Sequence, residues 1–211
     1  MPDLSTLAVF SAAALVLAFM PGPGIFYIVG RTIAAGRTDG YASILGTTMG
    51  GFVHVFAGVV GVSALIMTSA TAFMALKVVG GVYLVYLGIK TWRSGRQAEI
   101  DFSSSSEGGA WRAFRDGIIV EATNPKTAAF FLALIPQFID PSRGTVGLQF
   151  FVLGATSIAL NVVADLVYTF AASSARTLLM RRPHIVRRLR QGSGAVLTSL
   201  GISVLLSRQP A

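Results

Sequence analysis

Two long apolar segments of this chain are each interrupted near the middle by residues that break helices. The first begins near Leu4 and contains Pro21-Gly22-Pro23-Gly24, and the second begins near Gly117 and contains Asn124-Pro125-Lys126. Each segment is long enough to cross a bilayer as a helix. Open backbone is tolerated at membrane depth only where it is buried in protein or lines a cavity. Two such interruptions in corresponding halves of a chain indicate the binding site of a transporter.

The composition is that of an integral membrane protein. Of the 211 residues, 53% are hydrophobic and 12% are charged, whereas a soluble domain carries about 25% charged residues. The formal net charge is +8, but the basic residues cluster in short loops, which indicates membrane topology and not nucleic-acid binding. The chain has no cysteine and only two histidines. We expect no cofactor and no metal site, because a metal needs several converging ligands.

Apolar runs of about 18 residues or more predict six membrane-spanning helices. We expect them near Leu4–Val29, Tyr41–Met67, Phe73–Trp92, Phe114–Ile139, Val146–Ala172 and Gly192–Leu206, the last being the shortest.

The six helices divide the single domain into two halves of three, residues 4–92 and 114–206, joined by a polar linker over 94–112. Because three is odd, the halves would have opposite orientations, as in an inverted repeat. The expected fold is an all-α membrane protein of two inverted three-helix halves, with broken helices at Pro21–Gly24 and Asn124–Lys126. Arginine and lysine are concentrated at 30–40, 93–113 and 176–191, so we expect these loops in the cytoplasm and both termini outside.

The first interruption is predicted to expose backbone that binds an anion. Pro21 and Pro23 remove backbone donors, and Gly22 and Gly24 permit unusual dihedral angles. The half-helix that follows would point its free N–H groups into the protein, where they attract a carboxylate. The alternative is a proline kink that only shapes packing.

The second interruption adds a charge. Asn124 suits the cap of the following half-helix, and Pro125 suits its first position. Lys126 lies about a dozen residues into the span, where a cation is costly unless it meets water, a partner or an anionic substrate. The alternative is that the lysine side chain extends to the cytoplasmic surface.

Two carboxylates inside predicted spans are further candidates. Asn161 and Asp165 are four residues apart and share a helix face, with Tyr168 on the same side. An intramembrane carboxylate is a proton carrier, an ion ligand or a partner for a substrate amine; for Asp165, the alternative is a buried salt bridge to Lys126. Glu121 lies one turn before the second interruption, so it either approaches the same cavity or pairs with an arginine near residues 93–115.

Two features of the second predicted span favour structural roles. A lone His54 on a glycine-rich face is more often packed and hydrogen-bonded than a ligand. The Gly46-x-x-x-Gly50 spacing permits close contact between helices. That contact is commoner within one chain of a multispan protein, and the alternative is a homodimer.

Four stretches of the chain resemble the LysE/RhtB family of bacterial amino-acid exporters. They are Pro21–Gly24, the segment Ala75–Trp92, the segment from Asn124-Pro125-Lys126 to Pro136-Gln137-Phe138, and the Asp165 region with the arginine-rich loop after it. Two positions depart from the pattern of that family. Gly24 stands where an asparagine is usual, and Gly51 stands where many members carry an acidic residue.

The resemblance implies a carrier in the bacterial inner membrane that exports a small amino acid or analogue, driven by protons. The alternative function is export of a heavy metal or another ion by a related architecture. The substrate site would lie between the two interruptions, with backbone N–H groups and Lys126 on the carboxylate. Asp165 would hold the amine or the coupling proton, and Glu121 is the second candidate for proton coupling. The candidate substrate-binding residues are Pro21, Gly22, Pro23, Gly24, Asn124, Pro125, Lys126, Asn161 and Tyr168.

Overall fold

The computed structural model describes residues 2–68, 70–94, 109–174 and 183–206, and the regular structure in these ranges is entirely helical. The α-helices are α1 (Leu4–Ala18), α2 (Pro23–Ala35), α3 (Arg37–Thr68), α4 (Ala70–Ser94), α5 (Gly109–Ala122), α6 (Pro125–Ala133), α7 (Val146–Ser174) and α9 (Pro183–Leu206). Two short 3₁₀ helices, η2 (Ile135–Phe138) and η3 (Pro141–Arg143), lie between α6 and α7.

Among the described residues, two bent helix pairs and two long single helices are apolar enough to cross a membrane. Helices α1 and α2 meet at an angle of 51°, and α5 meets the segment Pro125–Phe138 at 46°. Helices α3 and α7 contain continuous apolar stretches long enough to cross a membrane. Helices α4 and α9 have 25 and 24 residues, which at about 1.5 Å per residue exceeds a hydrocarbon core of about 30 Å. The predicted all-α membrane fold with two broken helices is confirmed.

At three places the helices extend beyond the predicted boundaries. Helix α9 begins at Pro183, ahead of the predicted span near Gly192–Leu206, because proline suits the first helical position and the arginines after it are good helix formers. The segment 30–40 is helical on both sides of Gly36, and this single residue, with a φ of 93°, forms the turn between α2 and α3. The segment 93–113 is helical up to Ser94 and from Gly109 onward; the rest of the predicted linker lies outside the described residues.

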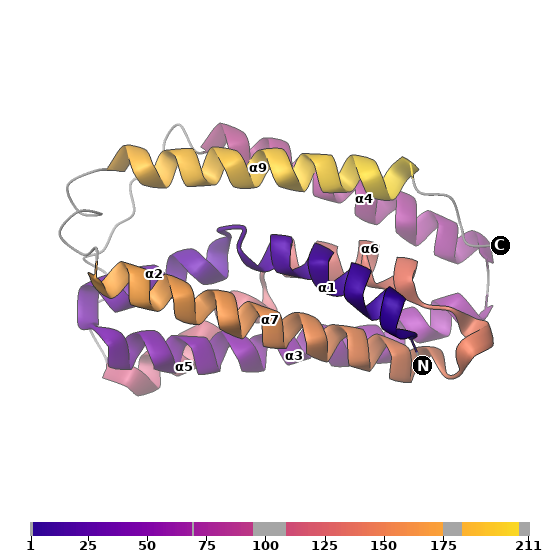
Figure 1. The fold of residues 1–211 in the computed structure, drawn as a ribbon, viewed down its shortest axis with the longest axis horizontal. Helices are drawn as coiled ribbons and strands as arrows, with labels where there is room; N and C mark the ends of the chain where they lie inside the picture. Colours follow the sequence, from indigo (N-terminus) through magenta and orange to yellow (C-terminus); the bar gives the residue numbers. More distant parts are fainter. Residues whose placement is uncertain (1, 69, 95–108, 175–182, 207–211) are drawn as a thin grey trace.

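Figure 1 shows the arrangement of the helices. Helices α4 and α9 pack side by side along one side of the molecule, and α3 packs against both α5 and α7. Helix α6 contacts both α3 and α4 and so links the two groups. The start of α1 and the end of α9 lie at the same end of the molecule, as expected for an even number of spans.

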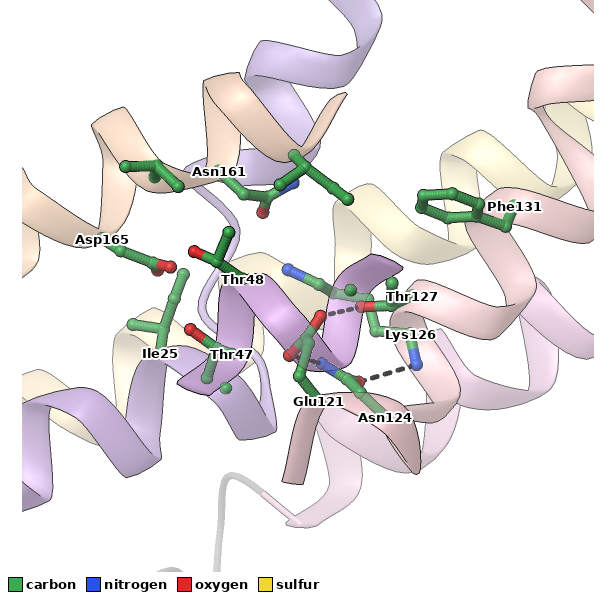
Figure 2. Close-up of a pocket in the computed structure, with 14 residues that line it drawn as sticks. Ile25, Thr47, Thr48, Glu121, Asn124, Lys126, Thr127, Phe131, Asn161 and Asp165 are labelled. Carbon is green, nitrogen blue, oxygen red and sulfur yellow. Dashed lines mark hydrogen bonds between the residues drawn. The ribbon is translucent and has the colours of Figure 1, made fainter. Parts of the chain in front are cut away.

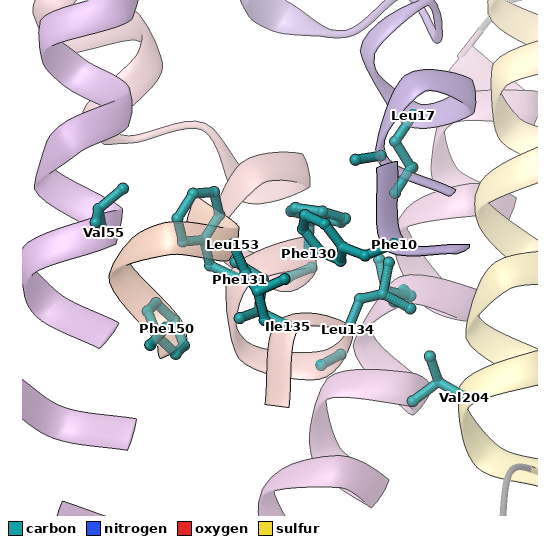
Figure 3. Packing of buried hydrophobic residues seen from close by; sticks show 14 of the residues in the cluster. Phe10, Leu17, Val55, Phe130, Phe131, Leu134, Ile135, Phe150, Leu153 and Val204 are labelled. Atoms are coloured by element: carbon teal, nitrogen blue, oxygen red, sulfur yellow. The ribbon is translucent and has the colours of Figure 1, made fainter. Parts of the chain in front are cut away.

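The half-helices α1 and α6 are held in place by the apolar core (Figure 3). The Phe10 ring of α1 lies 6.0 Å from the Phe130 ring of α6, and Phe131 lies 6.1 Å from Phe150 of α7. These separations between ring centroids are typical of favourable aromatic pairs. Helix α6 is therefore packed against α1 on one side and against α7 on another.

Large apolar residues also face outward, as a bilayer requires. Val60 and Phe56 of α3, Val79 of α4 and Val163 of α7 are each about half exposed or more. In water such a surface would be an interaction or aggregation site, whereas in lipid it contacts acyl chains.

The predicted close helix contact lies within the chain. A side-chain carbon added at Gly46 would come within 2.1 Å of the Phe114 carbonyl oxygen, and one at Gly50 within 2.5 Å of the Ile118 carbonyl oxygen. Helix α5 therefore packs directly on the backbone of α3, and the interpretation of the two glycines as an intramolecular contact is confirmed.

Ion pairs connect the helices at both ends of the molecule. At one end, Arg31 of α2 and Asp39 of α3 form a buried pair with a 2.8 Å separation, and Arg31 also donates to the Gly109 carbonyl at 3.0 Å. At the other end, Arg143 pairs with Asp3, ahead of α1, and with Asp140 at 3.2 Å.

The carboxylates at the second end stay ionised in acid. The Thr6 backbone N–H, which donates to Asp3 at 2.7 Å, holds the pKa of that carboxyl well below its usual range. Hydrogen bonds from Ser142 likewise lower the pKa of Asp140. The contacts of these carboxylates with Arg143 therefore persist through mildly acidic pH.

Candidate functional site

The first interruption is closed by side chains from the second half of the chain. The last carbonyls of a helix lack partners within it. At the end of α1, the Lys126 ammonium from α6 donates to the carbonyls of Leu17 at 3.2 Å and Met20 at 2.9 Å. The Tyr168 hydroxyl from α7 donates to the Phe19 carbonyl at 2.7 Å. Lys126 is only 8% exposed, so it does not extend to the surface.

The second interruption has its own caps. The Asn124 side chain accepts a hydrogen bond from the Lys126 backbone N–H at 3.0 Å, and Pro125 takes the first position of α6; both features were predicted. The Nε2 atom of His54 lies 2.9 Å from the Glu121 carbonyl oxygen. Because a carbonyl only accepts, Nε2 carries the proton. His54 also packs against the Phe131 ring, so it is hydrogen-bonded and packed as predicted.

A small polar cavity, called here the junction cavity, lies between the two interruptions (Figure 2). Its volume is about 30 Å³, which is room for about one water molecule. It is lined by Gly24, Ile25, Thr47, Thr48, Gly51, Glu121, Asn124, Lys126, Thr127, Phe131, Ile158, Asn161, Val162 and Asp165.

The Glu121 carboxylate lies between the first turns of α2 and α6. One oxygen accepts from the Thr127 hydroxyl, and the other accepts from the Asn124 amide at 2.9 Å. A side-chain carbon added at Gly24 would come within 2.5 Å of the second oxygen, so the carboxylate rests against the start of α2. The partial positive charge of helix N-termini favours an anion there. Of the two alternatives for Glu121, the geometry favours the cavity, since no arginine in the described ranges pairs with it.

Asp165 faces the junction cavity from α7 and is 8% exposed. Figure 2 shows its carboxyl group pointing toward Thr47, Thr48 and Glu121. Among the residues that the structure describes, it has no hydrogen bond, and Lys126 is not within ion-pairing distance. The salt bridge considered from the sequence is therefore not formed. A buried charge without a partner is costly.

Asn161 lies one turn before Asp165 on the same face of α7. Its amide donates to the Ser157 carbonyl at 2.9 Å, and its side chain lines the junction cavity. The two residues therefore present an amide and a carboxyl group to the same small space, as their spacing predicted.

The remaining candidates line a second, larger cavity. Pro21, Gly22, Pro23 and Pro125 border a space of about 410 Å³ that extends toward Lys90 and Thr91 of α4 and Leu197 of α9. Lys126 borders this space and also the junction cavity. The candidates thus divide into a group at the junction cavity, a group at the larger cavity, and Tyr168 at the end of α1.

Three threonines of the junction cavity were not predicted. Thr47 and Thr48 bond through their hydroxyls to the Ile44 carbonyl, one turn earlier in α3. Thr127 stands in the first turn of α6 and bonds to Glu121. A hydroxyl in an apolar span satisfies itself on its own helix and so gives little signal. No group of three or more metal-binding side chains occurs within the described ranges.

Comparison with known proteins identifies the relatives of this chain. The sequence model of the LysE type translocator family matches residues 15–208. A membrane protein of Vibrio cholerae without an assigned function is 30% identical over 95% of this chain and 96% of its own length. A homoserine/homoserine lactone efflux protein of Salmonella typhimurium is 30% identical over 91% of this chain and 92% of its own length. No solved structure matches.

Proposed function

Since this chain belongs to the LysE type translocator family, we propose that it exports a small homoserine-like amino acid or derivative from the cytoplasm in exchange for protons. Members of the family are transporters and not enzymes. The chain is a multi-pass membrane protein, and we place it in the bacterial inner membrane. The Salmonella relative that is named for homoserine efflux aligns over nearly the whole chain, which supports a substrate of that class.

The observation that carries the proposal is the junction cavity, which is lined by two acidic side chains, Glu121 and Asp165. Asp165 has no described partner, and Glu121 lies on the start of two half-helices. A zwitterionic amino acid matches this arrangement, because its ammonium suits Asp165 and its carboxylate suits helix N-termini. The cavity holds about one water, so this is a closed state. Rocking of the halves 4–92 and 114–206, proposed here as an inverted repeat, would open it to each side in turn.

Proton coupling follows from the energetics of Asp165. A buried carboxylate is neutralised either by a proton or by a substrate ammonium. Exchange of one for the other links outward movement of substrate to inward movement of a proton. A membrane potential supplies about 2.3 kcal/mol per charge per 100 mV, and about 1.4 kcal/mol corresponds to one decade. One proton can thus sustain roughly a tenfold or larger concentration ratio of substrate.

The test is uptake into inside-out vesicles that carry the protein. We expect an imposed pH gradient to drive accumulation of homoserine or homoserine lactone within a panel of amino acids. In the same vesicles, Asp165→Asn keeps the size of the side chain and removes its charge, so we expect at least a tenfold loss of uphill uptake. The matched control is Asp116→Asn, which changes a carboxylate of α5 that pairs with Arg112 and Arg115 away from the cavity.

Two further readouts separate the roles of Asp165. If it carries the proton, the Asn variant still exchanges substrate for substrate without a gradient. If it holds the substrate ammonium, exchange is lost as well. Uphill uptake at the wild-type rate in Asp165→Asn would falsify both versions, and absence of uptake across the panel in the wild type would contradict the proposed substrate class.

A further inference from the structure

We propose that the Glu121 carboxylate occupies the position that the carboxylate of the substrate takes during transport. Glu121 is then a built-in competitor that fills the anion site when substrate is absent. The inference rests on the proposed function for the identity of the substrate, but the anion site itself can be tested without transport.

The position has the features of a carboxylate site. Helix α2, of 13 residues, begins at Pro23, and its N-cap residue Gly22 has no side chain to cap it. The Asn124 amide and the Thr127 hydroxyl, at the start of α6, are aimed at the same point. Two neutral donors and two helix N-termini thus converge where Glu121 lies, and none of these features is specific for a glutamate of the same chain.

Asp165 supplies the independent observation that a ligand is expected here. It is buried, faces the same cavity and has no hydrogen bond or ion pair among the described residues. A ligand that neutralises Asp165 is a cation, and an α-amino acid carries its ammonium and its carboxylate on the same carbon atom. The space on the far side of the cavity from Asp165 is taken by Glu121. A bound zwitterion would therefore bring its carboxylate to the Glu121 position.

In the closed state, the volume of the cavity makes the two carboxylates mutually exclusive. With about 30 Å³ available, there is room for about one water molecule and not for a second carboxylate beside the first. Two like charges in this space would also repel each other. Substrate can bind only when the Glu121 side chain turns away, so its affinity is lowered by the free energy needed to displace Glu121.

The backbone at Glu121 is anchored, which restricts this movement to the side chain. His54 holds the Glu121 carbonyl at 2.9 Å, and the Asn124 backbone N–H donates to the same carbonyl at 3.0 Å. Rotation about the side-chain bonds of Glu121 then exchanges its carboxylate for that of the substrate, while α5 and α6 keep their positions. The donors at the anion site have a partner both before and after the exchange.

The test measures carboxylate binding to the full-length protein purified in detergent, by thermal unfolding in the presence of sodium acetate. Sodium chloride at equal ionic strength is the reference. Glu121→Ala vacates the anion site, so we expect acetate to raise its midpoint of unfolding by several degrees with a saturable dependence. The wild type, in which the site is filled, should show no shift beyond that of chloride. Asp116→Ala removes another carboxylate of α5 and should behave as the wild type.

Each outcome bears on the inference. Acetate that stabilises all three proteins equally, or that leaves a folded Glu121→Ala variant unaffected, overturns it. If Glu121→Ala does not fold, Glu121→Ser is measured in the same way, because its short hydroxyl also vacates the carboxylate position. If the variant binds acetate saturably but the wild type exports no amino acid, the anion site is supported and the transport proposal is rejected. If the wild type exports an amino acid but the variant does not bind acetate, only the anion site is rejected.

Discussion

At the scale of single residues, the buried ammonium of Lys126 supplies hydrogen bonds to backbone carbonyls at the first interruption. An ammonium has three donors, and two of them bind the carbonyls of Leu17 and Met20. The Leu17 carbonyl also accepts from the Met20 backbone N–H at 3.0 Å, whereas the Met20 carbonyl, beyond the end of α1, has the ammonium as its described donor. The stem of the lysine lies on Gly22, where an added carbon would come within 3.1 Å of it. One residue of α6 therefore holds both sides of the first interruption.

We predict that Lys126→Met destabilises the protein, because it removes the described donor of the Met20 carbonyl and one of the two donors of the Leu17 carbonyl. Leaving one buried carbonyl unpaired costs about 1–3 kcal/mol. Methionine keeps the length and most of the volume of the side chain, so the packing over Gly22 is preserved. Reversible unfolding in mixed detergent micelles measures the change.

Lys90→Met is the matched control, since Lys90 is exposed on α4 and contacts the ring of Tyr86. A surface change of that kind costs about 0.5 kcal/mol or less. Equal stability of the two variants would show that the Lys126 ammonium does not contribute through the α1 carbonyls.

Two other residues connect the cavity with the family pattern. Gly24 and Gly51, the positions where this chain departs from that pattern, both line the junction cavity. A carbon added at Gly51 would meet Ile158 at 3.4 Å, an ordinary contact, whereas one at Gly24 would collide with Glu121. A side chain at Gly24 is therefore incompatible with the observed position of the Glu121 carboxylate.

At the scale of elements, the two interruptions use different chemistry for the same result. The carbonyl ends of α1 and α5 are each bound by a side chain from elsewhere in the chain, Lys126 and His54 respectively. The amide end of α6 is capped by its own Asn124, but the amide end of α2 begins at a glycine without a side-chain cap. The N-terminus of α2 therefore lacks a side-chain cap of its own, and the nearby anion is the Glu121 carboxylate.

We predict that Pro21→Ala combined with Pro23→Ala abolishes export without preventing insertion. The two alanines restore backbone donors and remove the fixed angles of proline, so a continuous helix can replace the 51° bend. The start of α2 would then no longer point at the junction cavity. Export from vesicles, normalised to the amount of folded protein, measures the effect.

Pro141→Ala is the control, because Pro141 lies in η3, outside both interruptions. We expect that variant to export at the wild-type rate. Unchanged export in the double variant would reduce the Pro21–Gly24 sequence to a dispensable kink.

The local features of the elements could be predicted from the sequence, and the contacts between them could not. The breaks, the Asn124 cap and the position of Pro125 depend on a few neighbouring residues. The bond from Tyr168 to the Phe19 carbonyl joins residues 149 positions apart, and nothing in either local sequence specifies it. The same holds for Lys126, which was predicted to bind a substrate carboxylate; that role stays a prediction, because the structure places two backbone carbonyls on its ammonium.

At the scale of the whole molecule, charge is divided between the two ends. The end that holds the Gly36 turn and the start of α5 carries Arg31, Arg37, Arg112 and Arg115, whereas Arg143 is the basic residue of the segment 139–145 at the other end. This division favours the first end in the cytoplasm. The orientation of the described helices is consistent with it, since α1 begins and α9 ends together.

We predict that a cysteine at Ser142 reacts with a membrane-impermeant thiol reagent from outside, and that a cysteine at Arg115 reacts only after the membrane is opened. Both positions are exposed, and the chain has no native cysteine, so each label reports one site. Labelling in intact cells measures the orientation. The opposite pattern would reverse the assigned topology and with it the direction of transport.

The turn at Gly36 determines how the molecule can move. One residue joins α2 to α3, and the buried pair of Arg31 and Asp39 clamps the two helices beside that turn. Helices α2 and α3 are therefore expected to move as one unit, because opening the turn between them would break a buried ion pair. When the halves shift, we expect the chain to flex at residues 19–22 instead, where Lys126 and Tyr168 bind the carbonyls of Met20 and Phe19 and no buried ion pair is described. The segment expected to bend is then the one that borders the proposed substrate site.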